Sequence, residues 1–209
     1  MKDANSSEKE TEVKFHISNP DYLIETLDLV DAILIQPRVM EINLRFDTPA
    51  MELSSQARVL RLRQDSEIHM TYKGAGHVEG EALARQEIEF TLSDFTAARH
   101  FLEALGYQVI LTYEKYRQTY SLDNVLITID EMPYGFFSEI EGPDGGKIKE
   151  TAALLGLNWE RRINTSYSDI FRLLKTKNNL SLKDLTFKNF KHLQINLEDI
   201  NIHPADLEQ

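Results

Sequence analysis

The chain has 209 residues, with 34 acidic and 23 basic side chains, which gives a formal net charge of −11 at neutral pH. Apolar residues make up 42% of the chain and charged residues 27%, a composition typical of a globular protein with a sizeable core. There are no cysteines, which excludes disulfides, thiolate metal sites and a cysteine nucleophile. The acidity argues against nonspecific binding to a nucleic-acid polymer, because such binding depends on neutralisation of phosphates by Lys and Arg.

The sequence shows no membrane or export segment. No stretch approaches the roughly 18 consecutive apolar residues that a membrane-spanning helix needs. The first residues, Met-Lys-Asp-Ala-Asn-Ser-Ser, lack the apolar centre of a signal peptide. We therefore expect a cytoplasmic protein without membrane contacts, in which the polar residues 1–9 form a loose N-terminus.

The first half of the chain mixes strand patterns with short helical ones. Alternation of apolar and polar side chains predicts strands, and Asn19-Pro20-Asp21 predicts the start of a helix. Ser93 is a typical helix N-cap, and Gly106 is a typical residue after a helix end. The predicted strands are 11–17, 33–47, 58–64, 68–73 and 82–92, and the predicted helices are 22–30 and 94–105.

The second half repeats this style, with predicted strands at 107–120, 125–130 and 136–141 and predicted helices at 144–155 and 166–174. Two glycine-rich segments depart from nucleotide-binding loop patterns. We interpret residues 74–80 as a hairpin loop and residues 142–147 as a turn that leads into a helix. The element order indicates an α+β fold with an antiparallel sheet of about eight strands.

The character of the sequence changes after residue 175. Asn178-Asn179 marks a break, and short apolar clusters follow within a polar background. We expect residues 10–174 to form one domain and residues 175–209 to form a C-terminal extension. This extension either docks on the domain or forms the contact of a homodimer.

Nearly every predicted strand carries one apolar face and one face with charges of both signs. A sheet with one solvated face gives this pattern. The alternative is an eight-stranded antiparallel barrel whose apolar faces point outward under helices and whose lumen is charged, so that it holds water, ions and a charged ligand. Within each strand, the polar residues that alternate with apolar ones point to the same side. These residues are Glu10, Glu12, Lys14, Asn43, Arg45, Asp47, Arg61, Arg63, Arg85, Glu87, Glu89, Lys115, Arg117, Thr128, Asp130, Glu139 and Glu141.

The residue types in such a lumen indicate its ligand. Several Arg and Lys side chains would converge on an anion with many oxygens, and a polyphosphate fits because Arg binds phosphate through two parallel hydrogen bonds. The carboxylates would repel one another without cations, and oxygen donors select Mg²⁺ or Mn²⁺ rather than zinc. Basic residues and metal-binding acids in one cavity indicate phosphoryl or nucleotidyl transfer chemistry. The basic side chains are Arg61, Arg63, Lys73, Lys115 and Arg117, and the acids are Glu10, Glu12, Asp130, Glu139 and Glu141.

A series of short motifs follows the order found in one protein family. The motifs are Glu10-x-Glu12-x-Lys14, Phe46-Asp-Thr-Pro49, Leu60-Arg-Leu-Arg63, Thr71-Tyr-Lys-Gly74, Arg85-Gln-Glu-Ile-Glu89, Glu114-Lys-Tyr-Arg117, Asp130, Gly135-Phe-Phe-Ser-Glu-Ile-Glu-Gly142 and Ser166-Tyr-Ser-Asp169. Together they resemble the CYTH superfamily, also called the triphosphate tunnel metalloenzymes, over about residues 8–174. The first motif alone would be weak, and the ordered series makes the resemblance specific.

The resemblance implies an eight-stranded tunnel, a divalent metal and a substrate with a triphosphate. It implies metal binding by Glu10, Glu12, Asp130, Glu139 and Glu141, and a central acidic pair, Glu87 and Glu89, that binds a second metal or orients basic residues. It implies triphosphate binding by Lys14, Arg61, Arg63, Lys73, Arg85, Lys115 and Arg117. Of these, Lys14, Lys115 and Arg117 are the expected catalytic residues.

The motifs look most like those of class IV adenylyl cyclases, with relatives among thiamine triphosphatases. Bacterial inorganic triphosphatases that resemble this fold carry a Tyr on the second strand, and residues 33–45 contain none. Three functions stay open. We favour hydrolysis of the terminal phosphate of ATP, thiamine triphosphate or tripolyphosphate over conversion of ATP to cAMP and pyrophosphate. The third alternative is non-catalytic binding of a nucleotide or polyphosphate.

Overall fold

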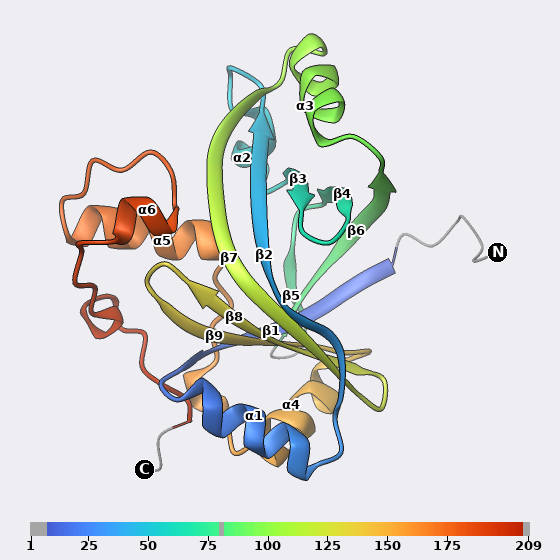
Figure 1. The fold of residues 1–209 in the computed structure, drawn as a ribbon, viewed down its shortest axis with the longest axis vertical. Helices are drawn as coiled ribbons and strands as arrows, with labels where there is room; N and C mark the ends of the chain where they lie inside the picture. Colours follow the sequence, from blue (N-terminus) through green and yellow to red (C-terminus); the bar gives the residue numbers. More distant parts are fainter. Residues whose placement is uncertain (1–7, 80–81, 207–209) are drawn as a thin grey trace.

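The computed structural model describes residues 8–79 and 82–206, apart from the side chains of residues 8–10, 78–79 and 82–83. The strands are β1 (Glu8–Ile17), β2 (Ile33–Asp47), β3 (Val59–Gln64), β4 (Ile68–Lys73), β5 (His77–Glu79), β6 (Ala82–Leu92), β7 (Gln108–Leu122), β8 (Val125–Met132) and β9 (Gly135–Glu141). The α-helices are α1 (Pro20–Leu29), α2 (Glu52–Ser55), α3 (Phe95–Ala104), α4 (Gly145–Leu154), α5 (Tyr167–Lys177) and α6 (Phe187–Phe190), and two 3₁₀ turns are η1 (Trp159–Arg161) and η2 (Leu197–Ile200) (Figure 1). Within the described ranges, no helix has the length and apolar character needed to cross a bilayer.

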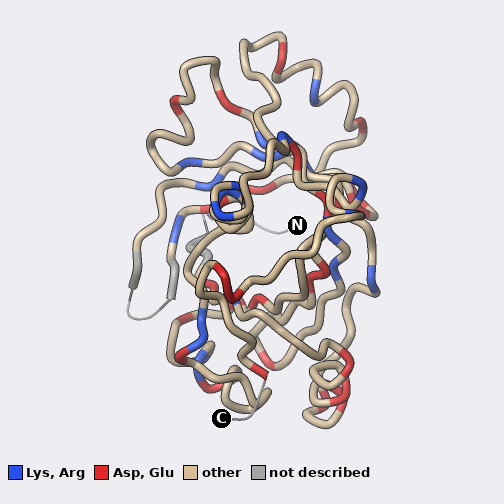
Figure 2. The backbone as a smooth tube through the Cα atoms, turned by 90° about the vertical axis from the view of Figure 1, so that its left-hand side faces the viewer, with Lys and Arg blue, Asp and Glu red and all other residues tan. Residues whose placement is uncertain are grey.

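Eight of the strands form a closed ring. They pair antiparallel in the order β1-β9-β8-β7-β2-β3-β4-β6, and the first five residues of β1 pair with β6 to close the ring. The short strand β5 pairs with the start of β6, where β4 no longer reaches. Figure 2 shows the backbone encircling the middle of the molecule, with basic and acidic positions interleaved along it. The predicted α+β barrel with eight antiparallel strands and outer helices is therefore confirmed.

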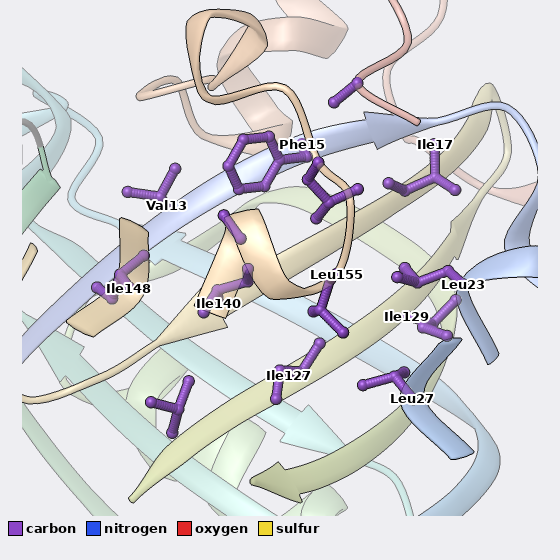
Figure 3. Close-up of a cluster of buried hydrophobic side chains, with 14 of the residues drawn as sticks. Val13, Phe15, Ile17, Leu23, Leu27, Ile127, Ile129, Ile140, Ile148 and Leu155 are labelled. Carbon is purple, nitrogen blue, oxygen red and sulfur yellow. The ribbon is translucent and has the colours of Figure 1, made fainter. Parts of the chain in front are cut away.

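The apolar faces of β1, β8 and β9 point outward and are covered by α1 and α4. Phe15, Ile127 and Ile140 of these strands pack there with Leu27 of α1 and Ile148 of α4, and all five side chains are fully buried (Figure 3). Burial of each such side chain contributes about 1.5–3 kcal/mol to folding. The core therefore lies outside the ring, which leaves the inner face of the strands to polar side chains.

Helix starts follow the sequence signals closely, with one shift. The carboxylate of Asp94, rather than the hydroxyl of Ser93, caps α3 by accepting a hydrogen bond from the backbone N–H of Ala97 at 2.9 Å. Both residue types are good N-caps, and Asp94 stands at the position from which the side chain reaches the N–H three residues later. Asp144 caps α4 in the same way, as expected of a turn that leads into a helix.

Two local features differ from the sequence expectations. Part of segment 74–80, expected as a loop, is strand β5, because its backbone finds partners on β6. The side chain of Asp47 does not line the cavity, although the alternation of β2 predicted it there. Asp47 is the last residue of β2, and its carboxylate accepts hydrogen bonds from the backbone N–H groups of Leu53 and Ser54, at the start of α2.

Residues after α5 lie along the outside of the barrel. Leu185 forms a bridge with β7, where its backbone bonds to those of Thr112 and Glu114 at 2.9 Å. Phe190 of α6 is buried against Phe171 of α5, in a second apolar cluster that also holds Leu197 and Ile202. This part of the chain covers the outer side of α5, the helix whose first turn faces the inside of the ring. The boundary at residue 175 stays a prediction.

Candidate functional site: a charged cavity inside the ring

The ring encloses a cavity of about 580 Å³. That volume lies within the range of small-molecule sites. All but two of the residues predicted for the site line it, namely Glu12, Lys14, Arg61, Arg63, Lys73, Arg85, Glu87, Glu89, Lys115, Arg117, Glu139 and Glu141. Asp130 lies fully buried behind the lining, and the side chain of Glu10 falls outside the described part of the chain.

One side of the cavity is a network that we call the buried wall, formed by Lys14, Lys115, Arg117, Asp130 and Glu139 on β1, β7, β8 and β9. Asp130 lies at its centre. Its two oxygens accept two hydrogen bonds from Arg117, each of 2.6 Å, and one of 3.1 Å from Lys115. The hydroxyl of Tyr167, from the first turn of α5, donates a further bond of 2.8 Å to Asp130. These four bonds fix the direction in which the Lys115 and Arg117 side chains point.

Glu139 joins Lys14 to the same network. Its carboxylate lies 2.6 Å from the Lys14 ammonium and also accepts a hydrogen bond from Arg117. Burial alone would raise the pKa of Glu139, but Lys14 and Arg117 hold it well below its usual range. Burial would likewise lower the pKa of Lys14, and Glu139 and Glu12 raise it instead. Both groups are therefore charged at neutral pH.

Glu41 of β2 is a member of the cavity that the sequence patterns did not single out. Its side chain is 1% exposed and lies 3.5 Å from Lys115 and 3.9 Å from both Arg63 and Arg117. Burial would raise its pKa, but Lys115, Arg117 and Arg63 lower it to about 2. Glu41 shares the inward phase of Asn43 and Arg45, so the alternation of β2 could have revealed it.

The opposite side is looser, and we call it the open wall, formed by Arg61, Arg63, Lys73, Glu87 and Glu89 on β3, β4 and β6. Glu89 lies 3.4 Å from both Arg61 and Arg63, and Lys73 lies 3.1 Å from Glu87. Burial alone would raise the pKa of Glu89, but Arg63, the hydrogen bond from Thr71, Arg61 and His69 together lower it. Both acids of the central pair therefore contact basic side chains, and their role stays a prediction.

Glu12 and Glu141 are the acids best placed for a divalent cation. They face each other across β1 and β9, a register that puts their Cβ atoms about 5 Å apart. Glu12 also accepts a hydrogen bond of 3.2 Å from Arg85. Carboxylate oxygens are the donors that Mg²⁺ and Mn²⁺ prefer, so this pair fits the metal that the resemblance implies. Among the side chains that the structure describes, no three acids or histidines form a ready-made metal site.

Further lining residues come from Tyr113 of β7 and from the first turn of α5. Tyr113 is partly buried, and burial by itself would raise its pKa, but Arg61 and Lys115 lower it. Ser166 and Ser168 reach the cavity from α5. Tyr113 stands in phase with Lys115 and was visible in the alternation of β7, whereas the position of α5 over the ring was not.

The comparisons with known proteins agree with this geometry. A candidate adenylate cyclase from Vibrio parahaemolyticus has 22% identity and a TM-score of 0.71, covering 80% of this chain and 99% of its own. A conserved hypothetical protein from Pyrococcus furiosus has 25% identity and a TM-score of 0.65, covering 77% and 98%. A candidate adenylyl cyclase from Hippeastrum, described as having a dominant triphosphatase activity, has 16% identity and a TM-score of 0.61, covering 78% and 95%.

These likenesses show the shared fold. Among curated proteins, none matches the chain. The CYTH domain matches residues 8–155, which include all eight strands of the ring and most of the charged lining. The chain belongs to the CYTH domain family, whose tunnel binds triphosphate substrates.

Proposed function

We propose that the protein is a divalent-metal-dependent triphosphatase that hydrolyses the terminal phosphate of a small organic or inorganic triphosphate. The observation that carries this proposal is the convergence of the seven predicted basic side chains on one enclosed cavity, where acids hold them in fixed positions. Arg and Lys bind phosphate oxygens strongly, and burial strengthens each contact. A linear, highly charged triphosphate matches this lining better than an apolar or neutral ligand does.

The buried wall supplies the catalytic groups in this proposal. In hydrolysis a water oxygen bonds to the terminal phosphorus, and the bond between this phosphorus and the bridging oxygen breaks. Negative charge then develops on that oxygen, in the part of the substrate that leaves. Lys14, Lys115 and Arg117 stabilise that charge, and they need no reorganisation because Asp130 and Glu139 already hold them. The open wall binds the rest of the chain of phosphates through Arg61, Arg63 and Lys73, with Arg85 beside them.

Glu12 and Glu141, with Glu10 two residues before Glu12, are the residues we assign to the metal. A bound Mg²⁺ or Mn²⁺ neutralises phosphate charge and lowers the pKa of a coordinated water. Asp130, Glu139 and Glu89 stay candidates from the sequence, although their oxygens already bind Arg and Lys. Their first role in this proposal is to orient those cations.

The relatives support the substrate class and leave the reaction open. The description of the Hippeastrum protein supports hydrolysis as the reaction of this chain. The description of the Vibrio protein supports formation of cAMP and pyrophosphate from ATP. In cyclisation the ribose 3′-hydroxyl attacks the α-phosphorus, so the same cavity would hold the nucleotide in another position.

Product analysis separates these three functions. The protein is incubated with ATP, thiamine triphosphate or tripolyphosphate and Mg²⁺ or Mn²⁺, and the products are resolved by chromatography. We expect orthophosphate from at least one substrate and loss of turnover in Glu12→Gln. Arg38→Gln is the matched control, because Arg38 pairs with Glu131 away from the cavity and is half exposed. Formation of cAMP and pyrophosphate would establish the cyclase instead, and binding without turnover would contradict both enzymes.

A further inference from the structure

Arg45 stands apart from the other cations of the cavity. Among the described side chains that line the cavity, eight are basic and six are acidic. Seven of the basic side chains lie within ion-pair distance of a carboxylate: Lys14, Arg61, Arg63, Lys73, Arg85, Lys115 and Arg117. Within the described residues Arg45 has no such partner, and its guanidinium donates a hydrogen bond of 2.5 Å to the neutral hydroxyl of Ser168.

The charge of Arg45 is not compensated by more distant acids either. Burial lowers the pKa of Arg45, and Tyr113, Asp169 and Asp47, which raise it, do not together offset this effect. The Asp47 carboxylate is engaged by backbone N–H groups of α2, and the Asp169 carboxylate by Ser166 and Arg172. Arg85, from the opposite side of the ring, lowers the pKa further by repulsion. Two cations that repel each other across a cavity favour an anion between them.

The neighbourhood of Arg45 also offers neutral polar groups. Ser168 belongs to the first turn of α5, whose positive dipole end favours a negative group, and Ser166 caps this helix while donating a hydrogen bond of 2.7 Å to Asp169. Asn43 shares the inward face of β2 with Arg45 and is 0% exposed, yet neither atom of its amide group has a hydrogen-bond partner. An unpaired buried amide is costly, and a bound ligand or water would satisfy it.

This neighbourhood is separate from the buried wall. Arg45 lies four residues along β2 from Glu41, a spacing of roughly 13 Å in an extended strand. Glu41 marks the place where Lys115 and Arg117 meet. A group bound at Arg45 is therefore a different part of the ligand from the group bound at Lys115 and Arg117.

We propose that Arg45 and Ser168 form an additional phosphate-binding subsite on the β2–α5 side of the cavity, next to the unpaired, fully buried amide of Asn43 on the same face of β2. The proposal deepens the proposed function, on which it rests for the phosphate nature of the ligand. The group it binds is either the far phosphate of a triphosphate or the next phosphate of a longer chain. Arg45 is then a specificity-determining residue, because it selects the length of the phosphate chain.

Calorimetric titration without metal tests the subsite independently of turnover. Tripolyphosphate and tetrapolyphosphate are titrated into the wild-type protein, Arg45→Gln, Ser168→Ala and the control Arg38→Gln, all with EDTA. We expect Arg45→Gln to bind about 10-fold to 100-fold more weakly, since it loses charged hydrogen bonds, and Ser168→Ala to bind a few-fold more weakly. Weakening for both ligands assigns the subsite to the triphosphate, and weakening for tetrapolyphosphate alone assigns it to the next phosphate.

If Arg45→Gln binds each ligand as tightly as the control Arg38→Gln does, the proposed subsite is wrong. That result leaves the triphosphatase proposal standing if the wild-type protein releases orthophosphate. Conversely, the wild-type protein can fail to hydrolyse any triphosphate while Arg45→Gln still binds oligophosphates more weakly. That result supports the subsite and contradicts the triphosphatase proposal. If Arg45→Gln does not fold, Arg45→Lys takes its place, because it keeps the charge and loses the two-pronged geometry, and the same comparison decides.

Discussion

The two walls of the cavity hold similar residues at different depths. In the buried wall the side chains of Asp130 and Lys115 are 0% and 3% exposed, whereas Glu89 in the open wall is 31% exposed. The Asp130–Arg117 contacts measure 2.6 Å, and the Glu89 contacts with Arg61 and Arg63 measure 3.4 Å. The pairing of arginine with carboxylate is therefore tighter at Asp130 than at Glu89.

Aromatic side chains pack behind the buried wall. Tyr167 and Phe137 pack edge to face behind the buried wall, and Tyr134 packs against Phe137. The ring of Tyr167 also lies 4.5 Å from the Lys14 ammonium. Charges held by such a layer have little freedom, so the buried wall suits a preorganised catalytic role. The Glu89 carboxylate of the open wall is more exposed, so we expect a phosphate to replace it at lower cost.

The largest expected effect is loss of stability when Asp130 is neutralised. In Asp130→Asn, Lys115 and Arg117 keep their charges without their closest partner, and removal of one member of a buried pair costs about 3–5 kcal/mol. Urea unfolding measures this loss. Glu89→Gln is the matched change in the open wall, with an expected loss of about 1 kcal/mol or less. Equal losses in the two variants would contradict the difference between the walls.

The second effect is a pH dependence of stability that originates in the buried wall and its neighbour Glu41. The pKa of Glu41 is about 2, against an ordinary value of 4.5. A carboxyl whose pKa falls on folding stabilises the folded state above its unfolded pKa, and this contribution disappears as the pH falls from about 4.5 towards 2. This difference between the two pKa values corresponds to a contribution of about 3 kcal/mol to the free energy of unfolding at neutral pH.

Urea unfolding at a series of pH values between 7 and 2 measures this contribution. We expect Glu41→Gln to be less stable than the wild type at pH 7 and to depend less steeply on pH below 4.5, because the glutamine does not titrate. A slope in Glu41→Gln identical to that of the wild type would show that other carboxyls, such as Glu139, account for the acid sensitivity.

The sequence predicted the walls through the alternation of each strand, and it failed where that alternation ends. Arg61 and Arg63 share a phase, as do Glu139 and Glu141, so ring closure carried them all inward. Asp47 shares the phase of Arg45, but it is the last residue of β2, and its carboxylate binds backbone N–H groups of α2 instead of lining the cavity. Such a contact depends on how the chain turns after the strand, which the alternation of the strand does not show.

Contacts between distant segments were equally out of reach. Arg45 and Ser168 are 123 residues apart, and their hydrogen bond depends on how α5 lies over the ring. Periodicity assigns a residue to a face, but it does not say which helix covers the end of a barrel. The Tyr167–Asp130 bond escaped prediction for the same reason. The parts of the site built by neighbouring strands were predictable, and the parts built by α5 were not.

The third effect concerns activity. Here substitutions in the open wall are expected to lower the rate with little change in stability, whereas Asp130→Asn in the buried wall lowers stability. Arg61→Gln and Arg63→Gln remove phosphate donors from the open wall, and loss of one donor to a developing charge typically costs about 10²-fold in rate. We expect kcat/KM for the best triphosphate to fall by this order while urea unfolding changes by about 1 kcal/mol or less. A loss of stability as large as that of Asp130→Asn would show that the open wall is structural too.

The smallest expected effect comes from Glu87, which lies 3.1 Å from Lys73 in the open wall. If Glu87 only orients Lys73, then Glu87→Gln keeps a polar group in place, and kcat/KM changes a few-fold at any metal concentration. If Glu87 binds a metal, the same variant raises the Mg²⁺ or Mn²⁺ concentration needed for half-maximal activity. Steady-state rates at a series of metal concentrations distinguish the two roles, with Glu12→Gln as the reference for a metal-binding carboxylate. We expect an unchanged metal requirement, because in this wall each acid pairs with a cation that must itself be held ready for phosphate.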